Sequence, residues 1–185
     1  MVPVMSLWVP ILVSAVIVFL VSAIIHMVLG YHRNDMRPLA KEAEVQTALR
    51  AFSIPPGDYA VPYGGSAEAR KGTFLERMKT GPVVIMTVIP AGPPAMGSSL
   101  ALWFLYSIVV GVFAAYITGR ALQPGTHYLE VFRFAGATAF LGYSLALAQN
   151  SIWYKRNWGA TLLSMFDGLI YGLLTAGTFG WLWPR

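Results

Sequence analysis

The sequence predicts an all-α integral membrane protein with four transmembrane helices and a small cytoplasmic α/β insertion between helices 1 and 2. Of its 185 residues, 56% are hydrophobic and 11% are charged, whereas a soluble domain of this size needs far more charge to cover its surface. The apolar residues are concentrated in long runs, and one polar segment interrupts them. The net charge of +5 does not indicate nucleic-acid binding, because the basic residues cluster beside the expected spans.

The first apolar run extends from about residue 7 to residue 29, and we assign residues 1–30 to transmembrane helix 1. Trp8 lies where an interfacial anchor is expected, and His26 is the one ionisable residue of the run. The run lacks the basic amino-terminal region and the cleavage site of a signal peptide, so we expect it to be retained as a helix.

The polar insertion covers residues 31–97 and carries eight Lys and Arg residues against six Asp and Glu residues. A short amphipathic helix is expected where apolar side chains recur at helical spacing, at Val45, Ala48, Leu49 and Phe52. A second short helix is expected over residues 66–79. Candidate strands lie over residues 58–63 and 83–89. Residues 82–97 have an alternative interfacial or re-entrant role, because they lead directly into the next apolar run.

Three further apolar runs predict transmembrane helix 2 over residues 98–120, helix 3 over 128–149 and helix 4 over 159–183. At about 1.5 Å per residue, each is long enough to cross a hydrocarbon core about 30 Å thick. Asp167 is the only ionisable residue of the fourth run.

The basic residues predict the orientation of the chain. Ten of the thirteen Lys and Arg residues lie in the insertion or in the link between the third and fourth runs, and four spans place these two segments on the same side. The positive-inside rule puts both segments in the cytoplasm and both termini outside.

Small residues recur every four positions in two of the runs and therefore lie along one side of each helix. The first ridge is Ser107, Gly111, Ala115 and Gly119, and the second is Gly168, Gly172, Ala176 and Gly180. Such ridges allow helices to approach closely in lipid. We expect the two ridges to pack against each other.

An intramembrane polar pair is expected between His26 and Asp167, which fall at similar depth in their spans. A carboxylate at membrane depth needs a partner, and Tyr171 and Thr175 follow it on the same stripe of the helix. The functional interpretation is a proton relay or a ligand-binding site. The structural interpretation, which we favour, is an interhelical contact that fixes which helices pack together.

Other candidate sites receive simpler interpretations. Glu130 and Arg133 are three residues apart and predict an ion pair at the outer face, although His127 raises the alternative of a metal or anion site there. His26 and His32 are six apart, a spacing that does not suit a shared metal on one helix. The chain has no cysteine. We therefore expect no metal, no cofactor and no catalytic residue.

Three segments carry a resemblance to known proteins: HMVLGYHRND, GPVVIMTVIPAGPPAMG and DGLIYGLLTAGTFGWLWPR. With these, the chain resembles uncharacterised small four-span proteins of bacterial inner membranes that have no assigned activity. The resemblance covers nearly the whole chain and implies a location in the bacterial inner membrane. It transfers no catalytic residue.

Two classes of function remain open. The favoured one is a non-catalytic accessory, assembly or scaffolding subunit that packs in the lipid bilayer against a larger complex, or against further copies of itself. The alternative is a small oligomeric transporter or channel that couples ions or protons through Asp167 and His26. A membrane enzyme is the least favoured class, because the sequence shows no nucleophile–base pair and no metal cluster. No nucleic-acid partner is expected.

Overall fold

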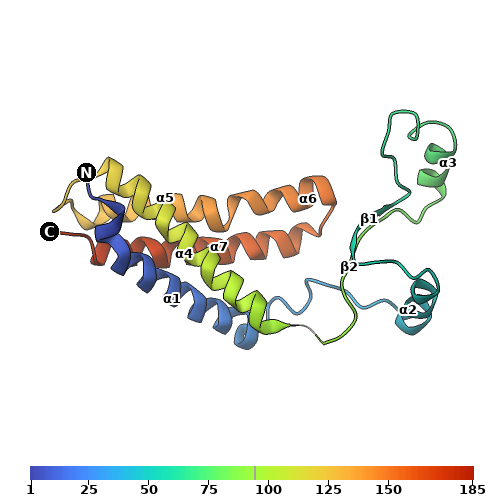
Figure 1. Ribbon diagram of the computed structural model, residues 1–185, viewed down its shortest axis with the longest axis horizontal. Coiled ribbons are helices and arrows are strands. Elements are labelled where there is room, and N and C mark those ends of the chain that lie inside the picture. The colour runs from blue at the N-terminus through green and yellow to red at the C-terminus, as the bar shows by residue number, and fades with distance from the viewer. Residues whose placement is uncertain (94) are drawn as a thin grey trace. The chain divides into compact units, whose positions relative to one another are not determined.

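The computed structural model describes residues 1–93 and 95–185 and is mostly helical (Figure 1). It divides into a helical unit, residues 1–36 and 95–185, and a polar unit, residues 37–94, of which residue 94 lies outside the described part. The helical unit contains four helices long and apolar enough to cross a membrane: Val4–Leu29, Met96–Ala121, Tyr128–Tyr154 and Trp158–Trp181.

Two of these long helices change their winding along their length. The first is a 3-10 turn (Val4–Leu7), then α1 (Trp8–Ile24), then a π-helical turn (Ile25–Leu29). The third is α5 (Tyr128–Tyr143), a 3-10 turn (Leu145–Leu147) and α6 (Ala148–Tyr154). The second and fourth are the uninterrupted helices α4 (Met96–Ala121) and α7 (Trp158–Trp181).

Both chain termini lie at one end of the helical unit, as the labels N and C show in Figure 1. The loop between α4 and α5 holds them there. The terminal amino group of Met1 donates to Gln123 Oε1 at 2.8 Å, and Trp183 Nε1 donates to the Gln123 carbonyl at 2.9 Å. Gly125 N also donates to the Pro184 carbonyl at 2.8 Å. These bonds place the start of the first long helix, the α4–α5 loop and the end of α7 together, as in an up-and-down bundle whose consecutive helices run antiparallel.

The four long helices pack in the cyclic order α1, α4, α5, α7, with the most extensive interface between α5 and α7. One group of buried side chains, around Leu7, Val131 and Phe179, fills the end near the termini. A second group, which includes Val18 and Tyr171, fills the other half.

The small-residue ridge of α7 packs on α5, which corrects the expected pairing of the two ridges. A Cβ atom at Gly168 would lie 2.7 Å from Ser144 Cβ, and one at Gly172 would lie 3.2 Å from the Phe140 nitrogen. The reason is connectivity, because the short link between α6 and α7 makes α5 and α7 antiparallel neighbours.

The ridge of α4 packs on the first long helix instead. A Cβ atom at Gly111 would lie 3.3 Å from Ile11 Cγ2, and Gly119 faces the backbone carbonyl of Val2. Each ridge therefore permits a close approach, as its spacing predicts, but the two ridges serve different interfaces.

The polar unit contains α2 (Glu42–Ala51), β1 (Gly57–Val61), α3 (Thr73–Thr80) and β2 (Val84–Val88). The two strands form an antiparallel sheet with Gly57 opposite Val88 and Val61 opposite Val84 (Figure 1). Strand β1 ends before Pro62, which has no N–H to donate to the sheet. The helix expected over residues 66–79 begins only at Thr73, because a turn in which Ala69 N donates to Ser66 Oγ precedes it.

Candidate functional site

A buried carboxylate, Asp167, lies in the middle of the candidate site. Only 3% of the residue is exposed, and both of its oxygens accept hydrogen bonds. Tyr31 Oη donates to Oδ1, and His32 Nε2 is 2.6 Å from Oδ2. A buried carboxylate is unfavourable unless its lone pairs are satisfied, and these two partners satisfy them.

The chain reaches Asp167 by turning back sharply at Gly30. This residue ends the π-helical turn with a φ of +65°, a conformation that favours glycine. The next residues form tight turns, in which Arg33 N donates to the Gly30 carbonyl at 3.2 Å. In a continuous helix, His26 and His32 would be about 9 Å apart along the axis. The turn brings their ring centroids to 4.6 Å instead.

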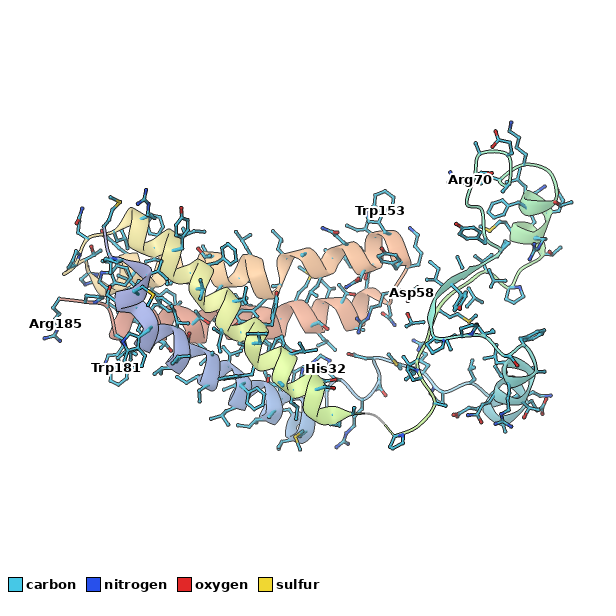
Figure 2. All side chains as sticks on the ribbon, in the orientation of Figure 1. His32, Asp58, Arg70, Trp153, Trp181 and Arg185 are labelled. Atoms are coloured by element: carbon cyan, nitrogen blue, oxygen red, sulfur yellow. The ribbon has the colours of Figure 1, made fainter. Side chains whose placement is uncertain are left out.

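His32 bridges two carboxylates and is labelled in Figure 2. Its Nδ1 lies 2.8 Å from Asp35 Oδ2, while its Nε2 faces Asp167. Burial of the imidazole lowers its pKa, but the hydrogen bonds to Asp35 and Asp167 outweigh burial, so the pKa of His32 is raised above its ordinary value. The imidazolium form can donate to both carboxylates at once.

Tyr31 remains a donor across the physiological range. Burial raises the pKa of its phenol, and the hydrogen bond to Asp167 and the negative charge of that residue raise it further, to about 12. The side chain therefore stays protonated and keeps its hydrogen bond to Asp167.

His26 lies beside this cluster without joining its hydrogen bonds. Within residues 1–93 and 95–185, Asp167 is bonded by Tyr31 and His32 rather than by His26, the partner that matching depth favours. The exposed His26 ring instead lies beside the His32 ring, with the two ring planes tilted by 46°. The polar sequence YHRND directly after Gly30 was the available signal for these partners, but a one-dimensional pattern does not give the direction of the turn.

His26, His32 and Asp167 together form a set of side chains of the kind that binds metal ions. One ligand atom each from His26, His32 and Asp167 lies within 4.8 Å of the other two. The six-residue spacing of His26 and His32 does not predict a shared metal site on one helix. The reversal of the chain direction at Gly30 brings the two side chains together.

The two other residues of the expected polar stripe do not reach Asp167. Thr175 Oγ1 donates to the backbone carbonyl of Tyr171 at 2.9 Å. The hydroxyl of Tyr171 is buried, and none of the described residues forms a hydrogen bond with it. Tyr171 as a whole is 4% exposed.

A cavity of about 580 Å³ adjoins the cluster and is lined by residues of all four long helices, His26 and Asp167 among them. Its walls carry an aromatic group, defined as Trp103, Tyr106, Tyr143 and Tyr171, whose neighbouring ring centroids are 5.6–6.0 Å apart. Trp103 is held by a hydrogen bond of 2.9 Å from its Nε1 to Ser22 Oγ. The arrangement is a mainly apolar chamber beside a small polar group, which is typical of ligand sites.

The expected outer-face ion pair is wrong. In the described part of the chain no salt bridge joins Glu130 to Arg133, and both residues are exposed. Exposed pairs at this spacing do form elsewhere in the chain, at Lys41–Glu44 and Glu76–Lys79, but such a pair contributes only about 0–1 kcal/mol, so little is lost where it does not form. His127 does not complete a site there, since its Nδ1 caps α5 by accepting from Leu129 N at 3.3 Å.

The cluster and the cavity offer hydrogen bonding, ion binding and aromatic packing. Comparison of the chain with protein-family models, with curated proteins and with solved structures finds no match.

Proposed function

We propose that this chain is a non-catalytic integral membrane protein of the bacterial inner membrane that binds a membrane-soluble amphiphile between its four long helices. One observation carries the proposal. The Tyr171 hydroxyl is buried without a partner among the described residues, and the Tyr171 side chain is one of those that line the 580 Å³ cavity.

An unpartnered buried hydroxyl is unfavourable by about 1–3 kcal/mol. A bound molecule with a hydrogen-bonding group beside Tyr171 removes this penalty, and the low proportion of polar atoms around the cavity suits an apolar body.

The aromatic group favours a flat head group. Trp103 contributes a large ring face, and offset or edge-on contacts with aromatic rings stabilise planar molecules by about 0.5–1.5 kcal/mol per pair beyond area burial. A planar head with carbonyl acceptors on an apolar tail, as in a quinone, meets both requirements.

A short-chain quinone is therefore the probe for the test. Titrated into the purified protein in mild detergent, it should quench tryptophan fluorescence saturably. Tyr171→Phe should weaken the affinity about fivefold, which corresponds to one hydrogen bond of about 1 kcal/mol. Tyr116→Phe is the matched control, because Tyr116 is 53% exposed on α4. Quenching that does not saturate, or equal affinities for the wild type and Tyr171→Phe, would refute the proposal.

A role as an accessory subunit is the second candidate, and a different observation favours it. The polar unit has an apolar groove of about 760 Å³ between α2 and the sheet, with Val45 and Leu49 on one side and Val61 and Met86 on another. An exposed apolar groove is typical of a surface that meets a partner.

Purification in mild detergent followed by mass spectrometry tests this second role. A stoichiometric partner that no longer co-purifies with the Leu49→Lys variant would support this role. Lys41→Glu, a substitution at an exposed position, is the control and should keep the partner. A homo-oligomer that carries ions into liposomes would instead support the transporter, and Asp167→Asn should then abolish the flux.

A further inference from the structure

We propose that His26, His32 and Asp167 bind a divalent first-row transition-metal ion such as Zn²⁺. The proposal goes beyond the binding of an amphiphile and does not rest on it, although His26 and Asp167 also line the cavity. It rests on three ligand side chains that lie together although they come from three segments of the chain. His26 belongs to the π-helical turn, His32 to the turn after Gly30 and Asp167 to α7.

The geometry is close to that of an ion site. The three ligand atoms lie within 4.8 Å of one another, and ligands at about 2.0–2.2 Å from a zinc ion are themselves about 3–4 Å apart. A separation of 4.8 Å must therefore shrink by about 1–2 Å. His26 can supply this movement, because its ring is exposed and none of the described hydrogen bonds restrains it.

Asp35 orients one of the ligands. It lies 2.8 Å from His32 Nδ1, which leaves Nε2 directed at Asp167. Histidine ligands in metal sites commonly donate their second ring N–H to a carboxylate, which fixes the orientation of the ring and strengthens the ligand. The Asp35–His32 pair has this arrangement before any ion is bound.

The charges of the cluster also favour a cation. Two carboxylates, Asp35 and Asp167, face the single imidazole of His32, so acidic groups outnumber basic ones around this ring. His32 coordinates a divalent ion through the lone pair of Nε2, while its Nδ1 faces Asp35. A bound cation would offset the negative charge of the buried Asp167 carboxylate.

The donor set selects the class of ion. Two imidazoles and one carboxylate suit zinc and its neighbours, whereas Mg²⁺ and Ca²⁺ prefer sites made of oxygen alone. Three protein ligands leave a fourth position of a tetrahedral ion for water or another molecule.

The test measures zinc binding by the full chain, purified in detergent through a tag without histidine and freed of metal with a chelator. Elemental analysis after removal of free ion should find about one Zn²⁺ per chain, and excess Mg²⁺ or Ca²⁺ should not displace it. Co²⁺ at the same site should give the visible absorption of a tetrahedral complex.

His26→Phe is the decisive variant, because it removes a ligand while keeping a ring against His32 and leaving the bonds of Asp167 intact. Zinc affinity should fall at least tenfold, with the metal-free melting temperature unchanged. Asp35→Asn should weaken binding about 10–100-fold through the orientation of His32. His127→Asn is the matched control, because asparagine also caps a helix, and its affinity should equal that of the wild type.

Three results would overturn the proposal. They are failure of the metal-free protein to take up zinc, equal zinc affinity in His26→Phe and the wild type, and equal competition by Mg²⁺. Tyr171→Phe separates this site from the cavity, since it should reduce binding of the quinone probe and leave zinc binding unchanged.

Discussion

Replacing Asp167 should show how much of the stability of the helical unit depends on the carboxylate cluster. Asp167→Leu removes the acceptor for Tyr31 and for His32 at once, because the two donors use different oxygens of the same carboxylate. A buried donor without a partner is unfavourable by about 1–3 kcal/mol, and more when it is charged. His32 retains Asp35, which limits its share, so we expect a total loss of about 2–5 kcal/mol.

Asp167→Asn should be much milder and serves as the matched variant. Its amide oxygen can still accept from Tyr31, and its NH₂ group can face a neutral His32 whose Nδ1–H donates to Asp35. We expect a loss below about 1 kcal/mol, since every group keeps a partner.

Thermal unfolding in detergent measures the difference. For a chain of about 150–250 residues, each kcal/mol lowers the melting temperature by about 2–4 °C, so Asp167→Leu should lower it by about 4–20 °C. The reasoning is refuted if the leucine and asparagine variants melt together, because the hydrogen bonds of Asp167 then contribute nothing measurable.

Three further predictions concern packing, pH and orientation. Gly168→Ala should destabilise the folded protein by about 1–3 kcal/mol in the same melting assay, because its Cβ would lie 2.8 Å from the Tyr143 carbonyl oxygen. Gly97→Ala is the control: its Cβ would meet no atom within 4 Å, so it should be neutral or stabilising. The pKa of His32 is raised in the folded protein, so its ion pairs stabilise the fold fully below about 6.5, its ordinary pKa, and less at higher pH. With chelator present, the melting temperature should therefore fall as the pH rises above about 6.5, and it should fall less in His32→Gln. Finally, the substitution Arg70→Cys introduces the single cysteine of an otherwise cysteine-free chain. This cysteine should not react with an impermeant thiol reagent added to intact cells, and rapid labelling would contradict a cytoplasmic insertion.

The four long helices follow from the sequence because apolar length alone identifies them. The run expected over residues 98–120 is α4, Met96–Ala121, and the run expected over 159–183 is α7, Trp158–Trp181. The third run is less regular, since a 3-10 turn at Leu145–Leu147 separates α5 from α6. No residue type in that segment predicts this turn.

The candidate site was only partly accessible from the sequence. The need of Asp167 for a partner follows from its apolar surroundings, but the identity of the partners depends on the left-handed turn at Gly30, which carries Tyr31 and His32 back to α7. The aromatic cavity is less accessible still. Its walls come from segments far apart in the chain, such as Trp103 and Tyr171, and only packing brings them together.

The ridges of small residues show the same division between local pattern and assembly. The four-residue spacing of Gly168 and Gly172 indicates a surface for close approach. It does not say which helix approaches, and that is decided by the short connection that makes α5 and α7 neighbours.

Native mass spectrometry of the protein released from its own membrane tests the central claim most directly. The wild type should carry one non-phospholipid amphiphile per chain, and Tyr171→Phe should carry markedly less, while Tyr116→Phe should match the wild type. A wild-type protein that carries no such molecule, or an adduct of equal occupancy in all three proteins, would contradict a ligand held at the Tyr171 hydroxyl.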